Sequence, residues 1–212
     1  MFPRPVPNIS SDDVLTWTEE VPKPLRALVW SLPDHHSVRV AALCAQLADA
    51  LDLNVREAAL CGFLHDVGKT RIPVSILNKT SRLSRKEYGV MQTHVQEGVW
   101  LIQQHWAEVP EQILQGVLEH HERLGGTGYP QKLPHLGVLG AIVAVADVFD
   151  ALTSRRPYRG AYSVRDALPL LQSEALPGQV IHSLIALMPT LETDAASTSI
   201  RAGAYASAVC VP

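Results

Sequence analysis

Cys61-Gly62-Phe63-Leu64-His65-Asp66-Val67-Gly68-Lys69 is the stretch around which this 212-residue chain is organised. A mostly apolar helical run ends there in a histidine beside an aspartate, and we expect Gly68 to stop the helix. Burying a carboxylate without a partner is costly, and one metal ion or a pair of ions would remove that cost for Asp66. Neighbours on a helix point about 100° apart, so His65 and Asp66 suit two directions into one site. The competing interpretation is a capped helix end with a polar pair at the surface.

The composition fits one domain with a sizeable core. The chain is 47% hydrophobic with a formal net charge of -3, which argues against general nucleic-acid binding because that function usually shows a basic balance. Three cysteines without metal-like spacing are typical of a reduced, cytoplasmic protein. No signal peptide is visible, and the most apolar run, Val138–Leu152, is too short for a membrane segment and contains two aspartates. We therefore expect a cytoplasmic protein with no membrane segment and no nucleic-acid polymer as partner.

Apolar residues repeat at helical spacing along most of the chain, so we expect an all-α fold with a single compact helical domain. Asn54 and Ser84 are each followed by a glutamate three residues later, which is typical of a helix start. The predicted helices cover about 11–20, 25–32, 37–51, 54–66, 84–102, 110–121, 138–152, a segment from 163 onward, and 179–188, with loops at 72–83 and 123–137. We divide the chain into an N-terminal arm with short helices (1–33), the compact domain (34–190) and a loosely held Ala/Ser-rich tail (191–212).

Seven potential metal ligands come from separate helices, at positions expected to face the core. They are a helix-start histidine (His35 or His36), His65, Asp66, His94, His120, His121 and Asp147. Imidazole and carboxylate suit Mn, Fe or Zn, and seven groups exceed the needs of one ion, so two ions bridged by Asp66 are more economical. Two ions about 3.5–4 Å apart can stabilise both oxygens of an in-line phosphoryl displacement, and Lys69 could pair with a phosphate oxygen. These residues alone indicate metal-assisted phosphoester hydrolysis.

The sequence resembles the HD-GYP family, a branch of the HD phosphohydrolases, from roughly His36 to Leu171. The family's motifs appear in order: HSxRVA at residues 36–41, HDxGK at 65–69, HHExxDGxGYP at 120–130 and DxFDALTxxRPYR at 147–159. The resemblance implies an α-helical enzyme that hydrolyses the bacterial messenger cyclic di-GMP to linear pGpG, and in many members on to GMP. Some members take the related cyclic GMP-AMP.

Carried over by motif, the resemblance gives each matching residue a role. His36, His65, Asp66 and Asp147 would bind the first metal, and Asp66 would bridge to a second metal held by His94, His120 and His121. Asp66 and Lys69 would act in catalysis, and Lys69, Asp150, Arg156 and Arg159 would line the substrate side. The motif spacing favours His36 over His35. Because the site lacks thiolates, iron or manganese is expected.

Several residues are expected outside these roles. Glu122 is expected to support the ligands rather than to bind metal. Arg39 and Arg155 are expected to be structural or solvated. The histidines that match no motif are expected at the surface or in loops, and they are His105, His135 and His182.

The chain departs from the family pattern in three ways. Gly125 stands where HHExxDGxGYP has its aspartate, which we interpret as a loop change and not as loss of a ligand. Leu32 stands where members with three metals carry a glutamate, so a third metal is not expected. Members usually follow a sensor or receiver domain, and we expect none within this chain. Regulation would then come from a partner such as a GGDEF or sensor domain at the Gly125–Pro130 loop, from a homodimer, or through the N-terminal arm.

Two alternatives to cyclic di-GMP hydrolysis stay open. One keeps the enzyme and changes its substrate to cyclic GMP-AMP or another nucleotide. The other is a non-catalytic module that binds cyclic di-GMP or a protein and uses the Tyr129-Pro130 loop as a docking surface. The intact ligand set argues against this module, and Gly125 and the expected absence of a sensor domain argue mildly for it.

Overall fold

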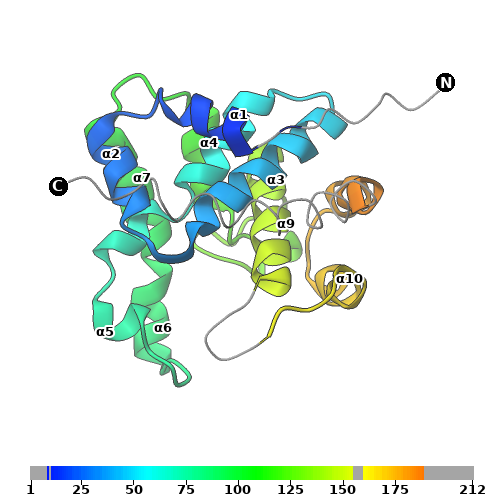
Figure 1. The fold of residues 1–212 in the computed structure, drawn as a ribbon. Coiled ribbons are helices and arrows are strands. Elements are labelled where there is room, and N and C mark those ends of the chain that lie inside the picture. Colours follow the sequence, from blue (N-terminus) through cyan, green and yellow to red (C-terminus); the bar gives the residue numbers. More distant parts are fainter. Residues whose placement is uncertain (1–8, 10, 155–159, 189–212) are drawn as a thin grey trace.

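The computed structural model describes residues 9, 11–154 and 160–188, and every regular element within these ranges is a helix (Figure 1). The α-helices are α1 (Ser11–Thr18), α2 (Lys23–Trp30), α3 (His36–Ala50), α4 (Val55–Leu64), α5 (Val74–Leu77), α6 (Arg85–Gln92), α7 (His94–His105), α8 (Glu111–Glu119), α9 (Val138–Thr153) and α10 (Val164–Ser173), and residues 178–188 form a further helix. Short 3₁₀ helices are η1 (Pro33–His35), η2 (Val67–Arg71) and η3 (Leu124–Gly126). The all-α prediction is confirmed.

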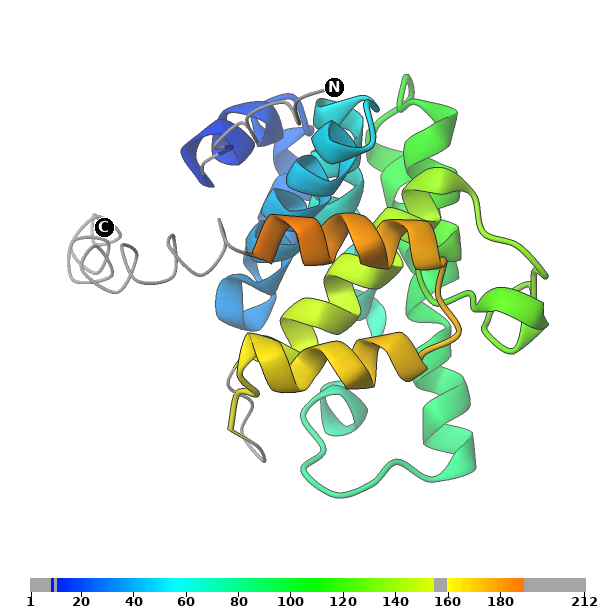
Figure 2. The same ribbon diagram turned by 90° about the vertical axis from the view of Figure 1, so that its right-hand side faces the viewer.

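Helix α9 lies at the centre of the core and is buried on nearly all sides, as its sequence predicted. Its apolar residues pack with those of α3, α4 and α8, and α7 packs on α8. Helix α10 and residues 178–188 lie side by side against α9, as Figures 1 and 2 show from two directions. Within the described ranges, no helix has both the length and the apolar character needed to cross a membrane.

The N-terminal helices α1 and α2 contribute to this same core. Val14, Leu25 and Val29 are buried together with residues of the later helices. Pro24 lies in the first turn of α2, where its missing N–H costs no helical hydrogen bond. Helices α1 and α2 therefore share one core with the rest, and the division at residue 33 between an N-terminal arm with short helices and the compact domain stays a prediction. The predicted tail at 191–212 lies outside the described residues.

The predicted helix over residues 84–102 is wrong, because it breaks at Thr93 into α6 and α7. The prediction placed Val90 and Met91 on the core face, but Val90 is exposed and Met91 only half-buried. None of the residues of α6 is buried, whereas α7 begins with the buried His94. The break separates α6 from the core and leaves His94 facing it. The predicted loop at 72–83 also contains one short helix, α5.

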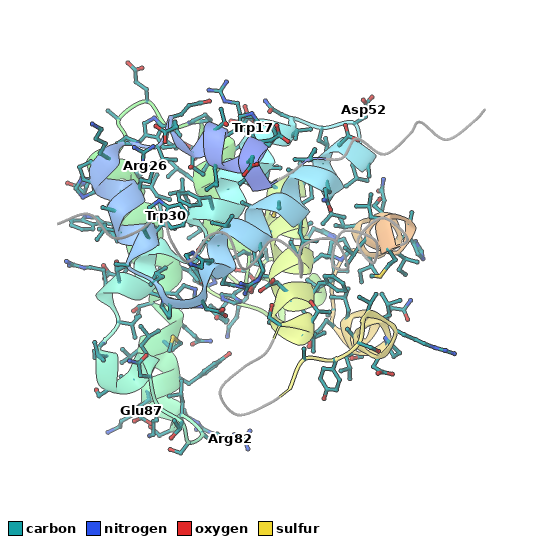
Figure 3. All side chains as sticks on the ribbon, viewed as in Figure 1. Trp17, Arg26, Trp30, Asp52, Arg82 and Glu87 are labelled. Carbon is teal, nitrogen blue, oxygen red and sulfur yellow. The ribbon has the colours of Figure 1, made fainter. Side chains whose placement is uncertain are left out.

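Helix α6 begins with the predicted capping box. The Glu87 N–H donates to Ser84 Oγ at 3.3 Å, and the Ser84 N–H donates to Glu87 Oε2 at 2.7 Å. Lys79 donates to both oxygens of Glu87, at 2.6 and 2.7 Å, and this contact with the capping box holds the pKa of Glu87 at about 2. Figure 3 shows Glu87 at the outer end of the α5–α6 segment, near Arg82. These contacts tie the start of α6 to the chain that follows α5.

Candidate metal centre

The structure brings the predicted metal ligands together from separate helices. His36 opens α3, His65 and Asp66 form the turn after α4, His94 opens α7, His120 and His121 follow α8, and Asp147 lies on α9. Their ligand atoms form two clusters that share Asp66. Most of these side chains are buried, so the site lies inside the helical domain and not on its surface.

Asp66 reaches the second cluster because η2 packs directly on α7. A Cβ atom on Gly68 would overlap the carbonyl oxygen of His94 and the backbone nitrogen of Gly98. Only a residue without a side chain permits such a close approach. Helix α4 already ends at Leu64, so the prediction that Gly68 stops the helix is wrong. Gly68 instead lets η2 bring Asp66 beside His94.

The first cluster consists of four ligand atoms at the meeting point of α3, α4 and α9. Asp147 Oδ1 lies 3.0 Å from His36 Nε2 and 3.8 Å from His65 Nε2. Asp66 Oδ2 lies 3.8 Å from His36 Nε2 and 3.3 Å from His65 Nε2. Two ligands that each lie about 2.0–2.2 Å from one ion are roughly 3–3.6 Å apart. These four contacts are therefore close to the spacing of ligands around one ion. The three residues whose ligand atoms all lie within 4.8 Å of one another are His36, His65 and Asp66, and Asp147 joins them through the two histidines.

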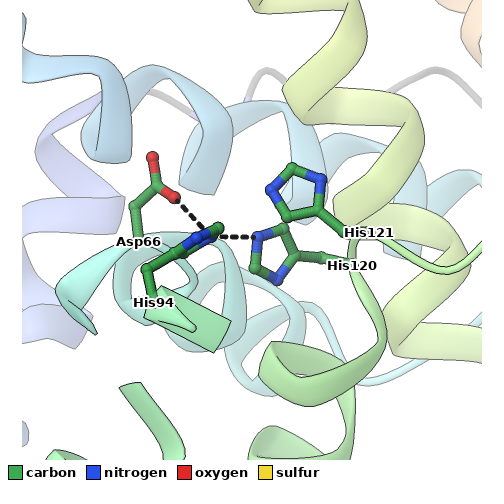
Figure 4. Close-up of side chains that lie close together, drawn as sticks. All are labelled: Asp66, His94, His120 and His121. Atoms are coloured by element: carbon green, nitrogen blue, oxygen red, sulfur yellow. Dashed lines mark hydrogen bonds and ion pairs between the residues drawn. The ribbon is translucent and has the colours of Figure 1, made fainter. Parts of the chain in front are cut away.

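The second cluster contains the other oxygen of Asp66 and three histidines, which Figure 4 shows facing one another. Asp66 Oδ1 lies 3.5 Å from His94 Nε2, and His94 Nε2 lies 3.4 Å from His120 Nε2. His121 offers a fourth ligand atom, and all four lie within 4.8 Å of one another. The two carboxylate oxygens of Asp66 thus face two different clusters.

Two buried atoms of the site lack a hydrogen-bond partner among the described residues. They are His65 Nε2 in the first cluster and Asp66 Oδ1 in the second. Buried polar atoms are nearly always paired, and an unpaired one costs about 1–3 kcal/mol. A cation in each cluster would satisfy both atoms. The residues present therefore fit two metal ions.

Comparison with known proteins assigns this chain to one family. A model described as HD domain matches residues 20–178. This chain belongs to the HD domain family. Its relatives include a cyclic di-GMP phosphodiesterase of Pseudomonas aeruginosa, 41% identical over 138 residues that make up 63% of this chain and 33% of the relative. A 3'3'-cGAMP-specific phosphodiesterase of Vibrio cholerae is 37% identical over 150 residues, or 68% of this chain and 34% of the relative.

A solved structure supports the fold of this HD domain. The HD domain of the L. monocytogenes phosphodiesterase PgpH, in complex with cyclic-di-AMP, matches with a TM-score of 0.61 and 20% identity, over 79% of this chain and 96% of that one. The resemblance to the HD-GYP branch is confirmed by the relatives. The chain spans about a third of the length of the curated relatives it matches.

Three imidazoles of this HD domain are oriented by the helix that carries them or ends just before them. The Nδ1–H of His65 donates to Gly62 O at 2.7 Å. His94 donates in the same way to Met91 O at 2.7 Å, and His120 donates to Val117 O at 2.6 Å. A carbonyl can only accept, so Nδ1 is the donor in each of these bonds and Nε2 is the nitrogen left to face the clusters. Hydrogen bonds of this kind orient the histidine ligands of metal sites.

His36 is oriented by a carboxylate instead. Its Nδ1 donates to Asp150 Oδ2 at 2.7 Å, and Arg39 donates to both oxygens of Asp150, at 2.7 and 3.1 Å. Asp150 is buried and does not line the cleft described below. The prediction put Asp150 on the substrate side, whereas the structure places it behind His36. The expectation that Arg39 is structural agrees with its place beside Asp150.

Protonation within the first cluster follows from these contacts. Burial by itself lowers the pKa of His36, but hydrogen bonds to Asp147 and Asp150 raise it to about 9. Burial raises the pKa of Asp66, yet His65 holds it well below its usual value. His36 does the same for Asp147. The carboxylates are therefore ionised, and the imidazole of His36 is protonated on both nitrogens and positively charged. It would release one of these protons on binding a metal.

The histidines of the second cluster are neutral. Burial lowers the pKa of His94, His120 and His121, to about 3 for His121. Neighbouring histidines lower the pKa of each further. Neutral imidazole is the form that binds metal.

A cleft of about 1280 Å³ opens over both clusters. Drug-sized ligands occupy pockets of about 300–1,000 Å³, so this cleft has room for a larger molecule. Lys69 lines it, and its Nζ donates to Asp66 Oδ2 at 2.5 Å. Tyr129 of the predicted 123–137 loop lines it too, and Leu77 and Asn78 line it from the α5–α6 segment.

Two buried glutamates hold the loop that carries Tyr129. Glu122 accepts backbone N–H groups from three successive residues, Gln131 at 2.5 Å, Lys132 at 2.9 Å and Leu133 at 3.0 Å. This agrees with the expectation that Glu122 supports the site without binding metal. Sequence reasoning missed Glu119, which accepts the N–H of Gly137 at 2.5 Å where α9 begins. Glu119 could have been recognised in the sequence as an acidic residue at the end of the apolar stripe of α8.

The remaining histidines are placed as expected. His36 is buried and His35 is exposed, which favours His36 as the ligand. His105, His135 and His182 are all exposed. Arg155, Arg156 and Arg159 lie outside the described residues.

Proposed function

We propose that this HD domain is a metal-dependent phosphodiesterase that hydrolyses cyclic di-GMP to pGpG, GMP or both. The observation that carries the proposal is Asp66, whose two oxygens face two clusters of histidines. The first ion would be held by His36, His65, Asp66 and Asp147, and the second by Asp66, His94, His120 and His121. Iron or manganese suits such imidazole and carboxylate ligands, and no thiolate belongs to either cluster. Two such ions supply Lewis acidity to a phosphodiester and lower the pKa of water.

The side chains around the clusters would bind and orient the substrate. Lys69 neutralises Asp66 in the structure, and a metal on Asp66 would take over that task. The Lys69 ammonium, which lines the cleft, would then contact a phosphate oxygen. Arg156 and Arg159 are proposed to bind the substrate on the strength of their motif.

Cyclic di-GMP is the first candidate because a relative at 41% identity is named for it. Cyclic GMP-AMP is the second candidate because a relative at 37% identity is named as specific for it. The volume of the cleft suits a dinucleotide of either kind. A non-catalytic module is less well supported, since six of the seven predicted ligands lie in two groups with metal-like spacing and the seventh, Asp147, lies 3.0 Å from His36.

Regulation and location are proposals from the sequence alone. A GGDEF or sensor domain would act through the Gly125–Pro130 loop, where a side chain at Gly125 would meet open space. A homodimer is the other route. We place the protein in the cytoplasm, acting on a cyclic dinucleotide and not on a nucleic-acid polymer.

The test is a hydrolysis assay on protein purified without oxygen and reconstituted with iron or manganese. We expect two ions per chain and turnover of cyclic di-GMP, with cyclic GMP-AMP assayed in parallel and the products resolved. Asp66→Asn should abolish turnover and lower the occupancy of both sites, whereas Asp49→Asn on α3, outside both clusters, should do neither. Two bound ions without hydrolysis of either dinucleotide would favour the non-catalytic module. A single ion at saturation, or a third, would overturn the binuclear site.

A further inference from the structure

His121 is oriented differently from the other histidine ligands. His36, His65, His94 and His120 each form a hydrogen bond through Nδ1. Among the described residues, no such bond is formed by the ring of His121. It stacks instead on Tyr129, with ring centroids 4.7 Å apart and an angle of 25° between the planes.

The backbone around Tyr129 holds its ring in this place. The Tyr129 N–H donates to the carbonyl oxygen of His121 at 3.1 Å. A Cβ atom on Gly128 would overlap that same carbonyl oxygen and the backbone nitrogen of Arg123. The loop therefore returns directly onto the end of α8, and the absence of a side chain at Gly128 permits it.

Glu122 fixes the other side of the turn. Its buried carboxylate accepts three consecutive N–H groups just after Pro130, at 2.5 to 3.0 Å. Bonds from N–H groups to an ionised carboxylate are stronger than neutral ones. Tyr129 is thus held between His121 on one side and a segment anchored by Glu122 on the other.

We propose that Tyr129 is a positioning residue for the second metal, because its ring sets the orientation of His121. The stacked ring takes the part that a hydrogen bond to Nδ1 takes for the other four histidines. Glu122 positions Tyr129 in turn through the loop. The inference rests on the proposed binuclear centre, but it concerns the binding of metal and not the substrate.

The test is a calorimetric titration of the metal-free protein with Mn²⁺, which is read out without any substrate. Tyr129→Leu removes the aromatic face and should weaken one of the two ions about 10- to 100-fold, the range usual for groups that support a metal ligand. Tyr129→Phe keeps the face and should stay within about threefold of the wild type. Glu122→Gln should weaken the same ion by a smaller factor. Tyr162→Leu removes an exposed tyrosine ring elsewhere and should bind both ions normally.

Three results would overturn the proposal. Unchanged affinities in Tyr129→Leu would show that the ring does not orient His121. Equal weakening of both ions would show that the ring acts on the fold as a whole. Equal losses in Tyr129→Phe and Tyr129→Leu would assign the effect to the hydroxyl. If both ions bind as expected but no dinucleotide is hydrolysed, the proposed function fails while the role of Tyr129 stands.

Discussion

Asp147 and Asp150 are three residues apart on α9, and the imidazole of His36 lies between their carboxylates. That spacing puts both aspartates on one face of the helix. Asp147 faces Nε2, the nitrogen directed at the first cluster, and Asp150 accepts from Nδ1 on the opposite side of the ring. These two aspartates on one helix face thus have different roles, because each contacts a different nitrogen of His36.

Replacing Asp150 with asparagine separates its two candidate roles. Asparagine keeps the shape but removes the charge that orients His36 and pairs with Arg39. We expect the affinity for one ion to fall about 10- to 100-fold in a Mn²⁺ titration, because the neighbours of a ligand tune its metal affinity. If Asp150→Asn instead binds both ions normally and only raises the KM for the dinucleotide, the substrate-side role predicted from the sequence is right.

At the scale of helices, the sequence predicted where helices start better than where they break. Ser84 forms its capping box, and the Asn54 side chain accepts the N–H of Glu57 at 3.1 Å. These capping signals involve residues only three apart, so they can be recognised in the sequence. The break at Thr93 and the packing of η2 on α7 depend on residues distant in the chain, so hydrophobic periodicity does not predict them. Gly68 was visible in the sequence, but its reason for being glycine lies in α7.

Gly68→Ala tests whether the close packing of η2 on α7 builds the site. The added methyl group would overlap the His94 carbonyl, so the two elements must separate and move Asp66 away from His94. Overpacking of this kind costs about 1–3 kcal/mol, to be measured by urea unfolding in chelator, and Mn²⁺ affinity should fall as well.

Gly89→Ala on α6 is the matched control, because a Cβ atom there meets nothing within 4 Å. Alanine is favoured over glycine inside a helix by about 0.8–1.0 kcal/mol, so this variant should be neutral or slightly more stable. Equal stability and metal affinity in Gly68→Ala and Gly89→Ala would contradict the packing role.

At the scale of the whole molecule, the ligands come from parts of the fold that are far apart in the chain. The first cluster joins the start of α3, the end of α4 and the middle of α9. The second joins η2, α7 and the end of α8 through Asp66. An ion in either cluster would therefore hold several helices together, and binding it would stabilise the folded state over the unfolded chain. The proposed metal centre thus predicts that stability rises with site occupancy.

Asp147→Asn tests this linkage by removing one ligand of the first ion. An ion at 100 times its Kd adds about 2.7 kcal/mol to the free energy of unfolding. In a domain of this size that is a rise of roughly 5–11 °C in Tm. We expect wild-type protein to melt well above its chelated form, and the difference to shrink in Asp147→Asn because one ion is lost. The chelated variant should change less, since it loses only the hydrogen bond with His36 and the longer contact with His65. If Asp147→Asn keeps the full metal-dependent rise in Tm, then Asp147 is no ligand and the first ion must be assigned to other residues.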